Sequence, residues 1–147
     1  MIRIAKTREI VSPIERVWET VSNLQNEKRQ WPVIRDIRVK SRNGNRIERE
    51  ATIMRGPLKS VKSIQSLVLE PKRSVTLTMT KGPLIGTRKI ILKALDDDKT
   101  RIDVTWEFEL EGIPTFAESF VKNNISELTE NALAEITKEA QAASPKS

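Results

Sequence analysis

Residues 12–24 read SPIERVWETVSNL, and this stretch contains a complete signal for the start of a helix. Ser12 is a typical N-cap residue, Pro13 suits the first helical position, and Glu15 follows three residues after the cap. The apolar residues at positions 14, 17, 18 and 21 share one helical face. We therefore predict a short amphipathic helix that ends near residue 23.

The segments on either side of this helix also carry signals of secondary structure. Residues 2–11 mix β-formers with polar residues, as an edge strand does. Asn23 can cap a second short helix, Leu24–Gln30, which must stop at Trp31-Pro32 because a residue before proline avoids the helical region. We predict one strand followed by two short helices.

From residue 33 to residue 110 the apolar period becomes two, and turn signals recur. The sequence Asn43-Gly44-Asn45 predicts a hairpin between strands Val33–Arg42 and Arg46–Arg55. Residues 102–110 alternate apolar with polar side chains, so one face of the sheet is predicted to face water. The further predicted turns are Gly56-Pro57, Glu70-Pro71-Lys72-Arg73, Gly82-Pro83 and Asp96-Asp97-Asp98-Lys99. With the first strand, this predicts seven antiparallel strands.

A long helix is predicted to start at Pro114 and run to about Ala143. Phe116 and Phe120 form an i, i+4 pair at its beginning. Its apolar stripe would cross the apolar face of the sheet and consists of Ala117, Val121, Ile125, Leu128, Ala132 and Ile136. We expect an α+β protein with one domain, residues 1–143, and a frayed tail, residues 144–147.

Composition limits the chemistry. The 147 residues carry a formal charge of +6 and include no His, Cys or Tyr, which excludes Cys- or His-based zinc sites, thiol nucleophiles and Ser-His arrangements. Residues 1–100 carry 22 basic and 11 acidic side chains, and residues 101–147 carry 4 and 9. No apolar segment approaches the ~20 residues of a membrane-spanning helix. We expect a cytoplasmic protein without a cofactor or metal.

The motifs resemble those of the START/polyketide-cyclase (SRPBCC) superfamily, whose helix-grip fold is shared with the birch-pollen allergen type and the coenzyme-Q-binding type. The resemblance is carried by Ser12-Pro13, Arg16-Val17-Trp18, Val21-Ser22-Asn23-Leu24, Trp31-Pro32, the strand at residues 34–39 and the hairpin at residues 69–75. It implies a curved seven-stranded sheet wrapped around the C-terminal helix. It also implies a ligand cavity between the two.

Strand parity suggests which residues line such a cavity, although each could equally fill a core. The apolar candidates are Ile37, Val39, Ile53, Leu77, Met79, Ile102, Val104, Trp106 and Phe108, with Phe116 and Phe120 as a cap. These side chains suit a hydrophobic or amphipathic ligand.

Three polar residues share the inward parity. Arg35 and Arg49 interrupt apolar alternation, and Asn124 lies in the helix stripe. An inward arginine could hold a carboxylate or phosphate, and Asn124 could bond a ligand headgroup. The alternative is that bulged or twisted strands let both guanidinium groups reach water.

Three functions fit these features. The first is binding of a hydrophobic or amphipathic small molecule or lipid in the cavity. The second is a cyclase, dehydratase or hydrolase that uses the same cavity, with catalysis resting on Arg, Lys, Asp or Glu. The third is a protein- or RNA-interaction module that uses the basic body and has a filled core. We favour the first, as a non-enzymatic or weakly catalytic binder. Nucleic acid is not favoured as a partner, since no aromatic residues interleave the basic ones. Peripheral contact with an acidic membrane surface stays an alternative. The sequence is compatible with a monomer or a homodimer.

Overall fold

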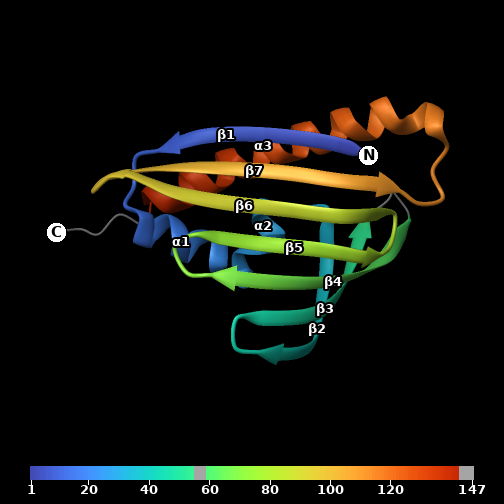
Figure 1. The fold of residues 1–147 in the computed structure, drawn as a ribbon, viewed down its shortest axis with the longest axis horizontal. Helices are drawn as coiled ribbons and strands as arrows, with labels where there is room; N and C mark the ends of the chain where they lie inside the picture. Colours follow the sequence, from blue (N-terminus) through green and yellow to red (C-terminus); the bar gives the residue numbers. More distant parts are fainter. Residues whose placement is uncertain (55–58, 143–147) are drawn as a thin grey trace.

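The computed structural model describes residues 1–54 and 59–142, which form one seven-stranded antiparallel sheet, several short helical segments and one long helix (Figure 1). The elements in chain order are β1 (Ile2–Ile10), α1 (Ile14–Ser22), the 3₁₀ turn η1 (Leu24–Asn26), α2 (Glu27–Gln30), β2 (Ile34–Asn43), β3 (Arg46–Met54), β4 (Ser60–Glu70), β5 (Ser74–Lys81), β6 (Leu84–Asp96), β7 (Lys99–Leu110), the 3₁₀ turn η2 (Thr115–Ala117) and α3 (Glu118–Ala142).

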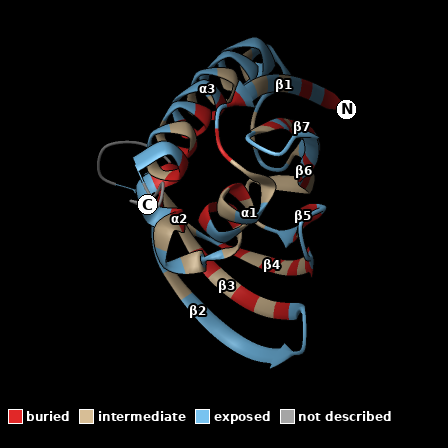
Figure 2. Ribbon diagram, turned by 90° about the vertical axis from the view of Figure 1, so that its left-hand side faces the viewer, coloured by how far each residue is buried: buried red, intermediate tan, exposed pale blue. Residues whose placement is uncertain are grey.

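Strands β2 to β7 form a meander, and β1 joins the sheet by a pairing that is distant in sequence. The strand order is β1-β7-β6-β5-β4-β3-β2, so consecutive strands from β2 to β7 are neighbours and β1 pairs with the last strand. Figure 2, an end-on view, shows the sheet curving around α1 and α2, while α3 runs along the open side. This arrangement confirms the predicted helix-grip fold.

The alternation in β7 explains which face of the sheet is covered. Ile102, Val104 and Phe108 are each fully buried, whereas Arg101, Glu107 and Glu109 are exposed. The apolar face packs against α3, whose buried residues are Thr129, Ala132, Leu133, Ile136 and Ala140. The C-terminal part of α3 therefore packs against the sheet to form the core, and Figure 2 shows buried residues in red on this part of the helix.

The helix begins after Ser12 as predicted, but the expected cap is wrong. The side chain of Ser12 makes no capping bond, and Pro13 is the residue at the N-cap. Instead, the Ser12 hydroxyl donates to the carbonyl oxygen of Ala140 at 3.4 Å, and the Ser12 carbonyl accepts from the Thr100 hydroxyl at 2.9 Å. Tertiary bonds to α3 and β7 replace the local one.

Other boundaries differ by a few residues. Asn23 does act as a cap, accepting from the Gln25 backbone N–H at 3.1 Å, but the second short helix is divided into η1 and α2. The long helix starts as the 3₁₀ turn η2 before α3 begins at Glu118. Three predictions lie outside the described residues: the Gly56-Pro57 turn, the end of the strand at Arg55 and the tail at 144–147.

Candidate functional site

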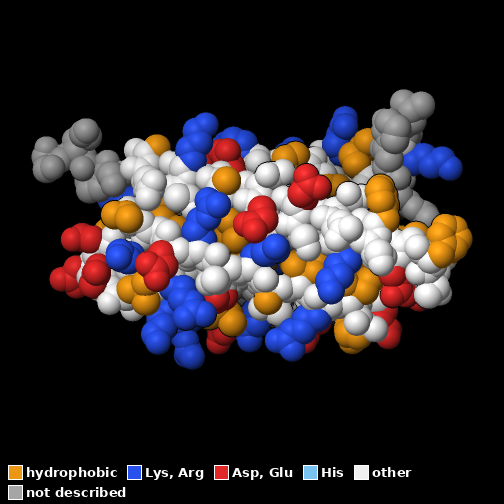
Figure 3. All heavy atoms as spheres, turned by 90° about the horizontal axis from the view of Figure 1, so that it is seen from above, with side chains coloured by type: hydrophobic (Ala, Val, Ile, Leu, Met, Phe, Trp, Pro, Cys, Tyr) orange, Lys and Arg blue, Asp and Glu red, His pale blue; other side chains and the backbone are white. Residues whose placement is uncertain are grey.

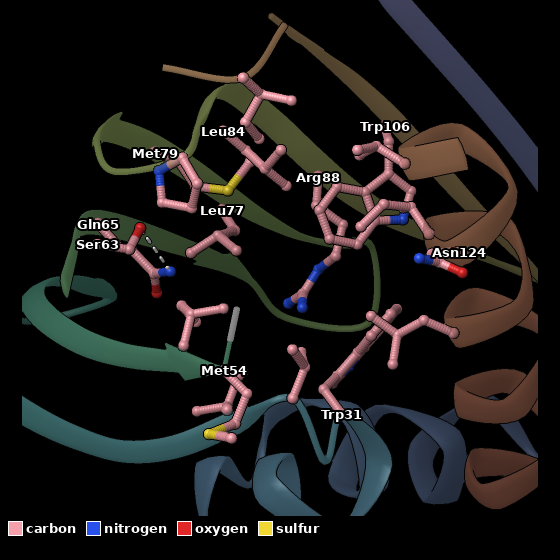
Figure 4. Close-up of a pocket in the computed structure, with 18 of the residues that line it drawn as sticks. Trp31, Met54, Ser63, Gln65, Leu77, Met79, Leu84, Arg88, Trp106 and Asn124 are labelled. Atoms are coloured by element: carbon pink, nitrogen blue, oxygen red, sulfur yellow. Dashed lines mark hydrogen bonds between the residues drawn. The ribbon is translucent and has the colours of Figure 1, made fainter. Parts of the chain in front are cut away.

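A cavity of about 600 Å³ lies between the sheet and the N-terminal half of α3. Figure 4 shows side chains from several strands and from α3 converging on it. Phe120 lines the cavity and is 68% exposed, so the cavity reaches the surface there. Its lining consists of Trp31, Val33, Ile34, Ile53, Met54, Ser63, Gln65, Leu77, Met79, Pro83, Leu84, Arg88, Trp106, Ile113, Ala117, Phe120, Val121, Asn124, Ile125 and Leu128.

The apolar wall follows from strand alternation. Leu77 and Met79 are two residues apart on β5 and are both buried, while Thr78 between them is on the other face. Trp106 projects from β7, where its indole N–H donates to the Thr129 hydroxyl of α3 at 2.9 Å. That hydroxyl donates in turn to the Ile125 carbonyl oxygen, which satisfies the polar atom of a buried indole.

A buried ion pair lies behind one wall of the cavity. Arg49 of β3 donates to both carboxylate oxygens of Glu27, at 2.6 and 2.7 Å, and its Nε donates to the Gln65 side-chain oxygen at 2.8 Å. Gln65 donates to the Ser63 hydroxyl at 3.1 Å. Glu27 and Arg49 are almost completely buried, so the pair ties α2 to β3 and offers no free group to the cavity.

Among the described residues, Arg88 of β6 is the one charged residue that lines the cavity. Its guanidinium carbon lies 4.6 Å from the Trp31 ring centre and 5.9 Å from that of Trp106, and the residue is 3% exposed. Its Nη2 atom is 3.9 Å from a Glu27 oxygen, too far for a hydrogen bond, and its Nε has no hydrogen-bond partner in the part of the chain that the structure describes. Burial lowers the pKa of Arg88 to about 10, against the attraction of Glu27 and together with the repulsion of Arg49. The group remains a cation at neutral pH.

The structure brings six of the fourteen sequence-predicted site residues to the cavity. Those that line it are Ile53, Leu77, Met79, Trp106, Phe120 and Asn124. Val104 and Phe108 lie fully buried in the core, Ile37 is half-buried, and Arg49 is buried in its ion pair. Ile102 is also core, whereas Val39 is 54% exposed. The expectation that Val39 lines the cavity is wrong.

The expected inward orientation of Arg35 is also wrong, because of a bulge. Ile34 pairs with Ile53 and Asp36 pairs with Thr52, which leaves Arg35 as the extra residue on β2. The alternation shifts there, and Arg35 is exposed. A second irregularity, between Val39 and Ser41, accompanies the exposure of that part of the strand.

The predicted aromatic cap is present only in part. Phe116 is 89% exposed and does not line the cavity, while its neighbour Ala117 does. The 3₁₀ turn η2 changes the helical phase at the start of the helix, so Phe116 and Phe120 are not one continuous inner surface. The prediction that Phe116 caps the cavity is wrong.

Trp31 and Arg88 line the cavity, and neither is among the residues predicted to do so. In the sequence, Trp31 marks the end of a helix and belongs to a family motif; in the structure it is 1% exposed. Arg88 precedes Ile90 and Leu92 with the period of a strand, and all three are buried. This alternation indicates from the sequence that Arg88 points inward, but it does not indicate how close Arg88 lies to either tryptophan.

Two further properties of the described chain concern ions and membranes. Within residues 1–54 and 59–142, no group of three or more carboxylates is placed to hold a metal ion. Among the same residues, no helix has the length and apolar character that crossing a membrane requires.

The curved antiparallel sheet, the long C-terminal helix and the cavity between them define a helix-grip protein of the START-like class. Residues 1–141 match the family described as polyketide cyclase / dehydrase and lipid transport. The chain belongs to this family. No curated protein sequence is a significant match to it.

Solved structures show the same fold. A protein from Thermus thermophilus is 20% identical, with a TM-score of 0.81 over 98% of this chain and 100% of its own. A START superfamily protein from Mycobacterium smegmatis is 15% identical, with a TM-score of 0.78 over 97% and 99%. The Zhui aromatase/cyclase from Streptomyces sp. R1128 is 12% identical, with a TM-score of 0.75 over 95% and 93%. At these identities the similarity concerns the fold.

Proposed function

We propose that this protein binds a hydrophobic or amphipathic small molecule or lipid in the cavity between the sheet and α3. The observation that carries the proposal is the cavity itself, about 600 Å³ with a mainly apolar lining. Protein interiors are close-packed, so an apolar space of this size forgoes many van der Waals contacts. A ligand of matching character restores those contacts.

The lining suggests a role for each predicted residue that reaches it. Ile53, Leu77, Met79 and Trp106 provide apolar contact from the sheet, and Phe120 provides it at the mouth. Asn124 lies on the α3 side, where Figure 4 shows its amide near the cavity. A mostly apolar site with a few placed polar groups is typical of small-molecule binding.

A cyclase- or dehydratase-type enzyme is the second candidate, and Arg88 is the observation in its favour. A cation in a dry apolar site can stabilise an oxyanion that develops during a reaction. However, the lining residues of the described chain include no carboxylate and no lysine that could transfer a proton. Ligand binding therefore explains the site without any proton-transferring group, whereas catalysis would require one.

The interaction-module hypothesis predicted a filled core, and the cavity does not match that expectation. Figure 3 shows one face of the molecule, on which lysines and arginines lie intermixed with acidic side chains. Such a face does not present the continuous basic surface that nucleic acid binds.

The proposal is tested with Nile red, a neutral dye whose fluorescence rises in apolar surroundings. We expect saturable binding of one dye per chain. Ile125→Trp adds volume at a position that lines the cavity, whereas Asn123→Trp adds the same side chain at an exposed position of α3 outside the lining. Ile125→Trp should weaken binding about tenfold or more, which corresponds to about 1.4 kcal/mol.

Asn123→Trp should bind the dye like the unmodified chain, and both variants should keep the circular dichroism of the folded protein. Equal affinity of the two variants, or no saturable binding at all, would contradict the proposal. Solvent extraction of freshly purified protein followed by mass spectrometry identifies any ligand that co-purifies.

A further inference from the structure

The buried charges beside the cavity do not balance. Arg49, Arg88 and Glu27 are each at most 4% exposed, and they comprise two cations and one anion. Both oxygens of Glu27 accept hydrogen bonds from Arg49, at 2.6 and 2.7 Å. The carboxylate is therefore committed to Arg49, and the site carries one excess positive charge, centred on Arg88.

The surroundings of Arg88 satisfy its charge only partly. Trp31 and Trp106 present aromatic rings to the guanidinium, but rings accept no strong hydrogen bond. Arginine has five N–H donors, and within the described residues the guanidinium of Arg88 makes no hydrogen bond. Glu27, 3.9 Å away and already bonded to Arg49, is the one opposite charge close to Arg88 among the described residues. Burying a charge without hydrogen bonds is costly, so a built site of this kind lacks one component, an acceptor with negative charge.

The Gln65 side chain, which also lines the cavity, is already hydrogen-bonded. The Gln65 oxygen accepts from Arg49 and its amide nitrogen donates to Ser63. Figure 4 shows the Arg88 guanidinium extending from β6 into the space between Leu77 and Trp31, and the cavity continues from there along apolar residues. A ligand that enters the cavity meets free donors at Arg88 and apolar surface beyond it.

We propose that the ligand of this cavity is an amphipathic monoacid, whose carboxylate binds the Arg88 guanidinium and whose apolar part extends toward Phe120 at the mouth. The inference rests on the proposed function and narrows its ligand class. One negative charge neutralises the one excess positive charge, and a planar carboxylate matches the paired donors of a guanidinium. Leu77, Met79 and Val121 provide the apolar surface for the rest of the molecule.

The test compares two compounds that differ only in the headgroup, decanoic acid and 1-decanol, as competitors of Nile red at pH 7.5. We expect decanoate to bind about tenfold or more tightly than decanol, because hydrogen bonds to charged groups contribute about that much. This comparison uses the unmodified chain and does not depend on any variant. Decyl phosphate, which carries more negative charge, should bind no better than decanoate.

Arg88→Met keeps an apolar side chain of similar length and removes the charge. It should lower the affinity for decanoate about tenfold or more and leave that for decanol unchanged. Arg38→Met is the matched control, because Arg38 is exposed on β2 and does not line the cavity. It should change neither affinity.

The outcomes separate the two proposals. If Nile red and both decyl compounds fail to bind, the proposed function fails and the inference fails with it. If decanol binds as well as decanoate, or if Arg88→Met lowers both affinities equally, the cavity binds ligands but the acid assignment is wrong. Tighter binding of decyl phosphate than of decanoate would overturn the monoacid in favour of a phosphate headgroup.

Discussion

The two halves of α3 have different surroundings although they belong to one helix. From Thr129 onward, five residues are buried against the sheet and α1. Before Thr129, none is buried, and the inner face lines the cavity with Phe120, Val121, Asn124, Ile125 and Leu128. The amphipathic pattern continues through both halves. The same helix therefore serves as core at one end and as the wall of a binding site at the other.

This difference shows where a binding site can form in a small protein. The closed end, defined as α1 together with α3 from Thr129 to Ala142, contributes stability through close packing. The open end, defined as α3 from Glu118 to Leu128 together with the cavity lining, leaves space and retains a buried charge at Arg88. Substitutions at the two ends should accordingly affect different measurements.

The largest loss of stability is expected from Gly86→Ala. Gly86 lies on β6 between Leu84 and Arg88, which both line the cavity at the open end. Gly86 on β6 has φ +152°, and an added Cβ would lie 2.0 Å from the Glu107 carbonyl oxygen and 2.6 Å from the Phe108 Cα. Both atoms belong to the backbone and cannot move aside easily. We expect a loss of more than about 4 kcal/mol in the free energy of unfolding, measured by urea denaturation.

Gly44→Ala is the control for that prediction. Gly44 also has a positive φ, +63°, but nothing lies within 4 Å of an added Cβ. The substitution should cost only about 1–2 kcal/mol, the strain of the left-handed backbone. Equal losses at both positions would mean that backbone strain, and not the close approach of β7, determines the effect at Gly86.

A smaller loss is expected from Leu133→Ala at the closed end. Leu133 is fully buried, so its truncation should lower the free energy of unfolding by about 3 kcal/mol. Val121→Ala at the open end removes a half-buried side chain and should cost below about 1 kcal/mol. Nile red affinity should show the reverse order, with the greater loss in Val121→Ala. A similar stability loss in both variants would remove the distinction between the two ends.

A stability change of the opposite sign, which depends on pH, is expected from Arg88→Met. At neutral pH, Arg88 is charged in both the folded and unfolded states, and its burial, which lowers the pKa to about 10, disfavours the folded one. Arg88→Met should therefore raise the free energy of unfolding of the ligand-free protein by about 1–3 kcal/mol at pH 7. Above pH 10 the folded protein loses this proton first, so the difference should diminish.

Parallel denaturation curves at pH 7 and pH 10.5 measure this difference, with Arg38→Met as the exposed control. A destabilised Arg88→Met variant at pH 7 would show that the contacts with Trp31 and Trp106 outweigh the cost of burying the charge.

The fold was largely predictable because its signals are local. The alternation at residues 102–110, the Asn43-Gly44-Asn45 turn and the helix start near Pro13 each depend on a few adjacent residues. Each was found within a few residues of its predicted place. The exception at Ser12, whose hydroxyl bonds to Ala140 instead of capping α1, involves a residue 128 positions away.

The site was predictable only in part, as Arg35 and Arg49 illustrate. Both interrupt the same kind of apolar alternation, and the sequence treats them alike. Arg49 lies opposite Gln65 in an uninterrupted register, so it points inward and reaches Glu27. Arg35 lies in a bulge and is exposed.

By itself, the sequence determined the order and type of the elements, the wet face of the sheet and the absence of histidine and cysteine chemistry, because composition and local periodicity decide these properties. The tertiary structure alone decided that Glu27 pairs with Arg49, that Arg88 lies beside two tryptophans with no hydrogen-bonding partner among the described residues, and that α3 leaves a cavity at one end. These features depend on strand register, a bulge and contacts between residues far apart in the chain, and a change of one residue in register exchanges the inner and outer side chains.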